Sequence, residues 1–223
     1  MRSSKFWPLA AALPVLLALP ALAHEPGTWV LRAGVGQVQP QSDNLTFSDG
    51  VDTITIDVDE STSLTLSGTY MFSPNWALDI LAAYPFSHDI NATVAGIPGS
   101  AKIGEVSQLP PTVSIQYHFL PDATFEPYVG LGLNWTTFFD EKLVPELVDQ
   151  GIEDLRIDDS FGLAAQVGAD WALGDHWLLN FDLRWINIEA DGELSGSVPG
   201  EMAEIGTVKI DPWVYSLNLG YRF

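Results

Sequence analysis

The sequence predicts an all-β protein, an eight-stranded antiparallel transmembrane β-barrel with short periplasmic turns and long acidic extracellular loops. The first observation is the segment 213–223, whose odd positions are all aromatic or aliphatic, whereas its even positions after Val214 are small or polar. This period of two describes a strand with one apolar face. Aromatic residues also stand at both ends of that face, as in the two interfacial girdles of a membrane-spanning strand. Finally, similar alternation occurs eight times in the chain, and an even strand number suits a closed bacterial barrel.

The eight segments are 29–36, 64–72, 76–86, 112–119, 128–136, 161–173, 177–188 and 213–223. In each, the residues expected to face lipid share one parity. In strand order they are Trp29, Leu31, Ala33, Val35; Leu64, Leu66, Gly68, Tyr70, Phe72; Trp76, Leu78, Ile80, Ala82, Tyr84, Phe86; Val113, Ile115, Tyr117, Phe119; Val129, Leu131, Leu133, Trp135; Phe161, Leu163, Ala165, Val167, Ala169, Trp171, Leu173; Trp177, Leu179, Phe181, Leu183, Trp185; and the odd positions from Trp213. The residues between them are mostly small or polar and are expected to face the lumen.

The lengths of the connections predict the orientation of the barrel. Residues 73–75, 120–124 and 174–176 form short turns, whereas 39–62, 87–106, 140–159 and 189–208 are long. Short turns of such barrels lie in the periplasm and long loops lie outside. Both mature termini are therefore expected in the periplasm.

The N-terminal residues predict export. Arg2 and Lys5 precede an apolar run, 6–19, and Ala21-Leu22-Ala23 fits the small-x-small cleavage pattern. The expected organisation is a cleaved signal peptide, 1–23, followed by the eight-stranded outer-membrane β-barrel, 24–223, integral to the bacterial outer membrane. Later segments lack the run of about 20 apolar residues of a spanning helix, which excludes a helical inner-membrane protein.

Composition restricts the chemistry further. The chain has no cysteine, which excludes disulfides, thiolate metal sites and a lipidated cysteine anchor. Its formal net charge is −20, from 9 basic and 29 acidic residues, which argues against nucleic acid as a partner.

Several motifs resemble the OmpW family. They include Leu109-Pro110-Pro111-Thr112, Pro127-Tyr128-Val129-Gly130, Asn134-Trp135-Thr136-Thr137-Phe138-Phe139, Asp211-Pro212-Trp213-Val214 and the closing Gly220-Tyr221-Arg222-Phe223. The resemblance extends over nearly all of the mature chain, whereas the long loops match poorly. It implies an eight-stranded outer-membrane barrel with a narrow, largely apolar lumen. It also implies uptake of small hydrophobic molecules with lateral release to the membrane, and links to stress adaptation and to phage or colicin reception.

The resemblance also implies a gate of apolar inward side chains on the third and seventh strands. Leu81 fits that role. The seventh strand departs from the family pattern, because Arg184 stands where an inward aromatic residue is expected.

The inward residues sort by depth into two groups. The ionic floor, toward the periplasm, comprises Arg32, Asp79, Asp170, Asp182 and Arg222. The candidate lumen and ligand residues, toward the outside, are Leu81, Ala83, Tyr128, Ile186 and Ile188, with Arg184 near the division. Charges in a membrane protein need partners, so the floor is read as an ionic plug, with a polar ion filter as the alternative. For the upper residues, ordinary packing and a hydrophobic-ligand site both remain open.

The long loops hold most of the acidic residues, for example Asp57 and Asp59 in the first and Asp158 and Asp159 in the third. Solvated charge is the simplest interpretation, with loose collection of divalent cations as the alternative. Residues 142–150 are expected to form a short surface helix.

No catalytic residue, cofactor or metal site is predicted. Ser87-His88-Asp89 is the strongest catalytic candidate, but neighbouring residues of a strand point to opposite faces. The four histidines lack the i, i+4 spacing of a helical metal site.

Two functions follow. The first is an outer-membrane channel for small hydrophobic molecules, in which Pro85, Pro110 and Pro111 locally open the wall, since proline removes ladder hydrogen bonds. The alternative is a structural or interaction barrel whose acidic loops bind a phage, colicin or host component. The expected partners are outer-membrane lipids and lipopolysaccharide, a small hydrophobic ligand, and the barrel-assembly machinery through the strand that ends in Phe223.

Overall fold

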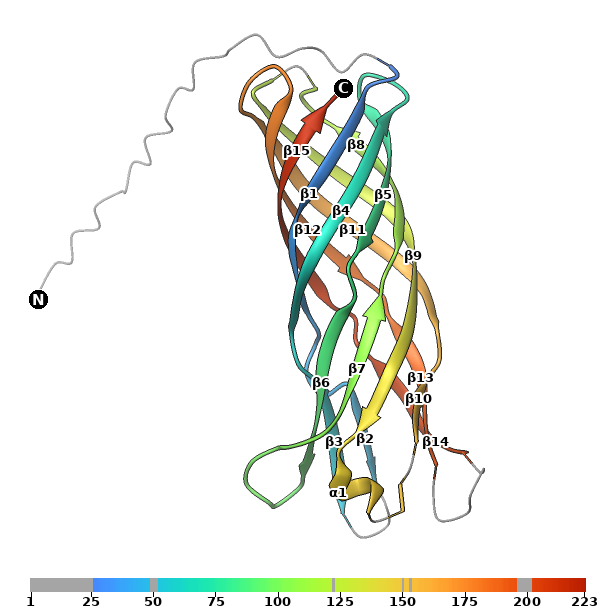
Figure 1. Ribbon diagram of the computed structural model, residues 1–223. Helices are drawn as coiled ribbons and strands as arrows, with labels where there is room; N and C mark the ends of the chain where they lie inside the picture. Colours follow the sequence, from blue (N-terminus) through green and yellow to red (C-terminus); the bar gives the residue numbers. More distant parts are fainter. Residues whose placement is uncertain (1–25, 49–51, 122, 150, 153, 196–201) are drawn as a thin grey trace, which may run out of the picture.

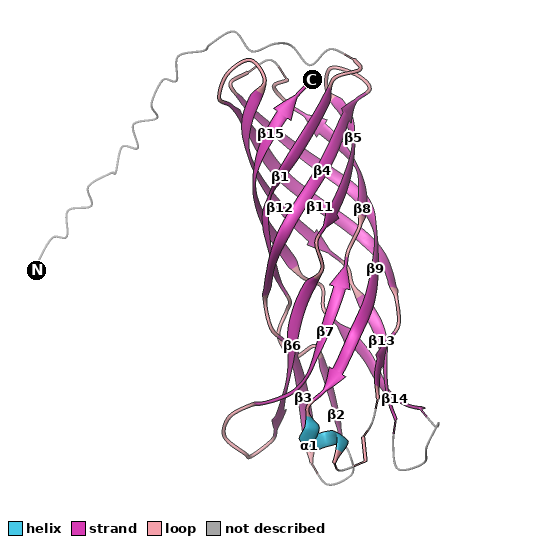
Figure 2. Ribbon diagram, in the orientation of Figure 1, coloured by secondary structure: helices cyan, strands magenta, loops and turns pink. Residues whose placement is uncertain are grey.

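The computed structural model describes residues 26–48, 52–121, 123–149, 151–152, 154–195 and 202–223. The expected signal peptide, 1–23, lies outside this part of the chain. The described residues form fifteen strands and one short helix, arranged as a tall barrel with an extension at one end (Figures 1 and 2). None of the helical residues described belongs to a helix of the length and apolarity needed to span a membrane.

Eight strands close the barrel, and the predicted fold class is confirmed. They are β1 (Trp29–Gln39), β4 (Ser61–Met71), β5 (Trp76–Ala83), β8 (Thr112–His118), β9 (Phe125–Leu143), β11 (Ser160–Ala172), β12 (Trp177–Ile186) and β15 (Trp213–Arg222). Each pairs antiparallel with its neighbour in the order given, and β15 pairs back to β1. Because the ring is closed, no strand edge of the barrel is left for lipid to face.

Along most of the wall the alternation acts as the sequence predicts. Leu131, Phe161 and Leu163 are among the most exposed side chains, whereas inward Arg32 and Asp170 are buried. Aromatic rings gather where the short turns and the C-terminus lie, which we call the turn end; the ring centroids of Trp76 and Tyr117 there are 4.9 Å apart. This apolar outer surface is the kind that lipid covers.

The opposite end, which we call the hairpin end, differs from the expectation of long loops. The connections contain the strands β2 (Leu45–Ser48), β3 (Thr53–Val58), β6 (Phe86–Val94), β7 (Ala101–Leu109), β10 (Leu155–Ile157), β13 (Glu189–Ser195) and β14 (Met202–Lys209). The order β9-β7-β6-β3-β2 extends the barrel sheet, and β10-β13-β14 forms a second, three-stranded sheet. Alternation at Ile54, Ile56 and Val58 is the sequence signal for these strands.

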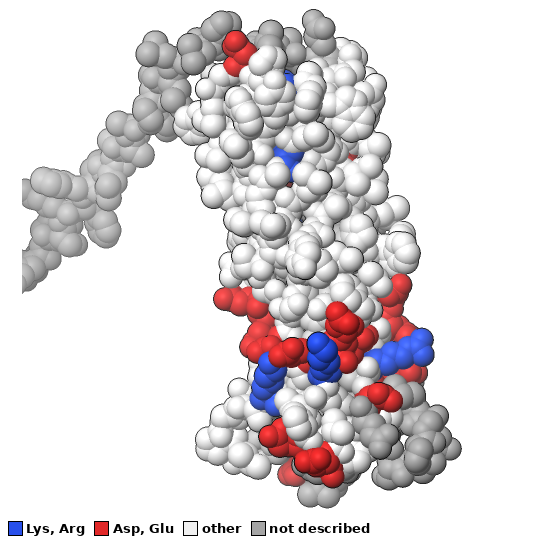
Figure 3. Space-filling model, viewed as in Figure 1, with Lys and Arg blue, Asp and Glu red and all other residues white. Residues whose placement is uncertain are grey.

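The helix α1 (Pro145–Val148) lies within the segment expected to be helical and sits at the hairpin end. Charged side chains also gather toward that end, while the barrel wall above them is nearly free of charge on the face shown in Figure 3. The distribution separates a water-facing extension from an apolar belt.

Candidate functional site

The interior at the hairpin end contains an apolar chamber with a volume of about 220 Å³. Its walls come from both sheets of the extension and from α1. The lining is made entirely of Val, Ile, Leu, Phe, Ala and Gly residues, among them Phe47, Ile54, Ile103, Leu147, Leu155 and Val208. The sequence-based prediction did not single out these residues, because it treated their segments as loops.

An apolar layer continues the chamber toward the barrel. Its buried members include Val38, Phe86, Val106, Phe138, Ala164, Ile186, Ile188 and Val214. Ile186 and Ile188, both expected in the outer half of the lumen, are 1% and 0% exposed here, and Ala83 packs against the same cluster. The chamber and the layer therefore form one continuous apolar interior.

Phe86 corrects one detail of the strand assignment. The sequence pattern predicts that its ring faces lipid, but the side chain is 1% exposed and belongs to the apolar layer. The strand β5 ends at Ala83 and β6 begins at Phe86. The break at Tyr84 and Pro85 changes which parity faces inward.

On the turn-end side of the apolar layer, the charged residues predicted for the ionic floor lie close to one another. Arg32 Nε donates to Asp170 Oδ1 at 3.1 Å, and Arg32 Nη1 lies 3.8 Å from Asp79 Oδ1. Thr69 accepts a hydrogen bond from Arg32 and donates to Asp79 Oδ1 at 2.6 Å. Arg184 Nη2 lies 3.3 Å from Asp79 Oδ2, and its Nε is 3.5 Å from Asp182 Oδ1. These side chains form one ion-pair network across the lumen.

Tyr128 lies in this network, which differs from its expected position among the outer lumen residues. Its hydroxyl donates to Asp182 Oδ2 at 2.8 Å and accepts from Asn180 Nδ2 at 3.0 Å. Asn180 also donates to Asp170 Oδ1 at 2.7 Å. The Arg32 guanidinium lies 5.7 Å from the centre of the Tyr128 ring.

The space left in the floor is small. A cavity of about 10 Å³, room for about one water molecule, is bordered by Leu81, Asp79 and Arg184. Leu81 therefore lies at the floor rather than in the apolar chamber, and Arg184 is a member of the ion-pair network.

Arg222 extends the floor to the turn end through a partner that the sequence-based prediction missed. Its Nη2 donates to both carboxylate oxygens of Glu126, at 3.1 and 2.9 Å. Glu126 is 0% exposed, and its inward parity, two residues before Tyr128, is the signal that could have identified it.

Among the described residues, the ligand atoms of His118, Glu126 and Asp170 lie within 4.8 Å of one another. Both carboxylates are already bound by arginine, Glu126 by Arg222 and Asp170 by Arg32. The geometry is therefore that of an ion-pair cluster rather than of a prepared metal site.

The alternation of β6 separates the side chains of the catalytic candidate, Ser87-His88-Asp89. In β6, Ser87 and Asp89 are exposed, while His88 is buried. Ser87 Oγ lies 3.0 Å from Ser107 Oγ, and Asp89 forms an ion pair with Lys102. The three side chains do not converge on one site.

The ladder of the wall is interrupted beside the apolar layer. Pairing between β5 and β8 stops at Leu81 and Thr112 and resumes between β6 and β7 at Phe86 and Gln108. The intervening residues, 82–85 on one side and 109–111 on the other, have no register partners across this boundary, which we call the seam. Three of them are prolines, and proline has no backbone N–H to donate.

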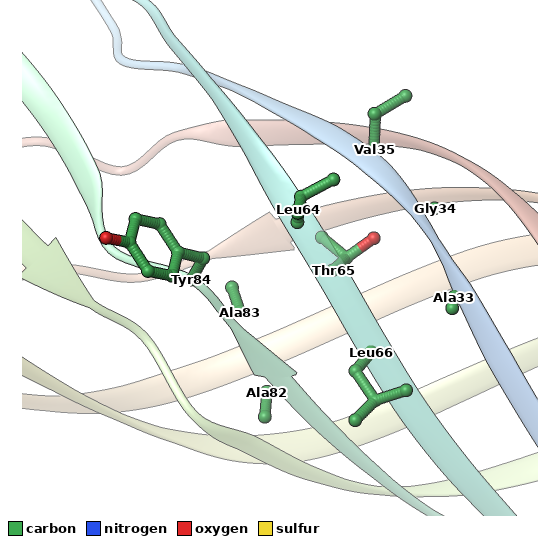
Figure 4. A pocket seen from close by; sticks show the side chains of 9 residues that line it. All are labelled: Ala33, Gly34, Val35, Leu64, Thr65, Leu66, Ala82, Ala83 and Tyr84. Carbon is green, nitrogen blue, oxygen red and sulfur yellow. The ribbon is translucent and has the colours of Figure 1, made fainter.

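A groove of about 640 Å³, the outer groove, lies on the wall over β1, β4 and the end of β5 (Figure 4). Its lining includes outward residues such as Leu64 and Tyr84, and also the small residues Gly34, Thr65 and Ala83 of the inward parity. Ala83 therefore borders both the outer groove and the apolar layer.

Comparisons with known proteins agree with this architecture. A sequence model of the OmpW family matches residues 25–223. Outer membrane protein W of Vibrio cholerae serotype O1 is 40% identical over 216 residues, covering 96% of each chain. The dibenzothiophene metabolism operon protein PahQ of Pseudomonas aeruginosa is 23% identical over 209 residues, covering 93% of each.

The solved structures include a crystal structure of the outer membrane protein OprG from Pseudomonas aeruginosa. It matches with a TM-score of 0.80 at 34% sequence identity, covering 90% of this chain and 98% of that one. The family resemblance that the motifs indicated is thus confirmed, and the fold is a β-barrel of outer-membrane type. The chain belongs to the OmpW family.

Proposed function

We propose that this barrel takes up small hydrophobic molecules at the hairpin end and releases them sideways into the outer membrane. In this proposal the hairpin end faces the exterior and both mature termini face the periplasm. A molecule enters the apolar chamber, passes the apolar layer and leaves through the seam.

The observation that carries the proposal is the change in the lumen at the ionic floor. The chamber is lined by apolar residues and the layer is built mainly of buried apolar side chains, whereas the floor is a network of buried ion pairs around a cavity of only about 10 Å³. Transfer of a hydrophobic molecule from water to the chamber lowers the free energy, whereas displacing the buried ion pairs of the floor would not. Ala83, Ile186 and Ile188 thus contact the molecule, and Leu81, Tyr128 and Arg184 stop it.

The seam supports a sideways exit. Ala83 and Phe86 flank Tyr84 and Pro85, and both pack into the apolar layer. Parting strands costs hydrogen bonds, but across the seam the ladder lacks register pairs between 82–85 and 109–111. The wall can therefore open there at lower cost than elsewhere.

A relative's name agrees with the ligand class. PahQ is named for an operon of dibenzothiophene metabolism, and dibenzothiophene is an apolar aromatic compound. A fused aromatic hydrocarbon is therefore a suitable first probe for this chain.

The test measures uptake of labelled naphthalene by bacterial cells that lack their own OmpW-family proteins. Cells that carry the wild-type protein are compared with cells without it. A triple variant, Pro85→Ala with Pro110→Ala and Pro111→Ala, restores three N–H donors at the seam. The matched control is Pro127→Ala, because Pro127 lies in β9 and pairs with Ala169, away from the seam.

Wild-type cells are expected to take up naphthalene faster than cells without the protein. The triple variant should lose most of this difference, and Pro127→Ala should keep it. Equal uptake with and without the wild-type protein would overturn the proposed function. Full uptake by the triple variant, inserted at the same level, would overturn the exit at the seam.

A further inference from the structure

One polar side chain lies within the apolar layer. Gln108 of β7 is 1% exposed, and its register partners are Phe86 on β6 and Phe138 on β9, both members of the layer. Gln108 also directly precedes Leu109, the first residue of its side of the seam. Gln108 thus lies between two aromatic side chains of the layer and next to the seam.

The orientation of the Gln108 amide is determined by a relay of two hydrogen bonds. His88 Nδ1 lies 2.6 Å from the backbone carbonyl oxygen of Asp59, and a carbonyl oxygen only accepts. Nδ1 therefore carries the proton of the neutral imidazole, and Nε2 is left as an acceptor. Gln108 Nε2 lies 2.8 Å from His88 Nε2, so the NH₂ group of the amide must be the donor there.

The relay leaves the amide oxygen pointing away from His88. Gln108 Oε1 is buried, and no donor among the described residues reaches it. Rotating the amide would place Oε1 against the His88 acceptor, so the protein cannot satisfy this oxygen by a simple flip. A buried carbonyl without a donor is unfavourable, and a donor that arrives with a ligand removes that cost.

We propose that Gln108 Oε1 is a hydrogen-bond acceptor for the transported molecule. The inference rests on the proposed function and names its substrate class: small apolar molecules that carry a single O–H or N–H donor, such as phenols. The apolar chamber and layer bind the hydrocarbon body, and Gln108 binds the donor before the molecule reaches the seam. One well-placed polar group in an apolar site is how such pockets select among similar ligands.

His88 is a positioning residue in this arrangement. It does not touch the ligand; it holds the amide so that the oxygen, not the NH₂ group, is presented. Its burial at 1% exposure and its bond to the Asp59 carbonyl keep the relay in one direction.

The experiment compares 2-naphthol with naphthalene, which differ by one hydroxyl group, in the cell uptake assay. The half-saturating concentration is measured for each probe in the wild type, in Gln108→Met and in Gln166→Met. Gln166 is a suitable control because it is a buried glutamine of β11 whose Cα pairs with Arg184 of the floor. If Gln108→Met inserts poorly, the double variant His88→Leu with Gln108→Met removes both polar partners together.

In the wild type, 2-naphthol should half-saturate uptake at a lower concentration than naphthalene. Gln108→Met should raise the value for 2-naphthol roughly fivefold, the worth of one neutral hydrogen bond, and leave that for naphthalene unchanged. Gln166→Met should change neither.

An unchanged 2-naphthol value in Gln108→Met, or an equal loss of both probes, would overturn the role of Gln108 while the proposed uptake stands. If the wild-type protein takes up neither probe, the proposed function itself fails.

Discussion

Arg184 Nη2 and Asp79 Oδ2 lie 3.3 Å apart, although their strands, β12 and β5, stand four places apart in the ring of eight. The pair therefore spans the lumen from wall to wall. Both side chains are almost fully buried, at 3% and 2% exposure. This ion pair and its neighbours fill the lumen on the turn-end side of the apolar layer.

Replacing Asp79 by Ala should strongly destabilise the barrel. The change removes the carboxylate that lies near both Arg184 and Arg32, which then keep only Asp182 and Asp170. Removing one partner of a buried ion pair costs up to about 3–5 kcal/mol. Unfolding by urea in lipid vesicles gives the free energy of unfolding. Asp158→Ala is the control, because its ion pair with Arg156 is exposed and such pairs contribute about 0–1 kcal/mol. Equal losses in the two variants would contradict a structural role for the floor.

Gly168→Ala should also destabilise the barrel, by about 1–3 kcal/mol through overpacking. A Cβ at this position would overlap the ring and hydroxyl of Tyr128 and would lie 2.6 Å from the carbonyl oxygen of Phe181. Tyr128 cannot move aside without losing its bond to Asp182. Gly174→Ala, where a Cβ meets nothing within 4 Å, is the matched control in the same unfolding assay. Retained stability in Gly168→Ala would mean that Tyr128 is loosely held.

Acidification should loosen the hairpin end through His88. Burial lowers the pKa of His88 from its ordinary value of 6.5, against a smaller opposing effect of its bond to Asp59. Below pH 6.5 the unfolded chain then binds more protons than the folded one, so stability is present above 6.5 and is lost as the pH falls further.

Hydrogen exchange of the β6 and β7 amides, measured above and below pH 6.5, tests this effect of His88. His88→Phe removes the titrating group, so the difference between wild type and variant isolates it from the many exposed acids. An identical pH response in both proteins would exclude His88 as the cause.

Leu131→Arg should reveal whether the outer surface meets lipid. Leu131 is 73% exposed in the middle of the apolar wall, and an arginine on a lipid-facing position near the bilayer midplane costs about 2–4 kcal/mol. Ile97→Arg, at the hairpin end and 62% exposed, should change stability by less than about 0.5 kcal/mol. The unfolding free energy in vesicles compares the two. A harmless Leu131→Arg would place that surface in water.

The sequence pattern was sufficient for the barrel because alternation is a local property. The outward Leu and Trp residues indicate which side of each strand faces away from the lumen. Eight such strands, joined by alternating short and long connections, predict a closed barrel. The same local reasoning predicted Arg32, Asp79, Asp170, Asp182 and Arg222 inside the lumen. In the structure Asp182 is partly buried and the other four are buried.

The alternation rule predicted the wrong side for a residue after a break in the strand, and it missed the strands of the hairpin end. The break at Tyr84 and Pro85 turned Phe86 inward, and its effect on parity depends on how the next strand pairs with β7. The strands of the hairpin end were missed because their alternation is short, and because they bury their apolar faces against one another rather than against lipid.

Residue alternation was sufficient to predict the eight barrel strands and the apolar outer side of most of them. Only the tertiary structure decided that Arg184 meets Asp79, that Tyr128 joins the floor and that Gln108 is held by His88. Alternation is encoded every two residues, whereas closure of the ring brings together side chains that are distant along the chain, such as Arg32 and Asp170, which are 138 residues apart.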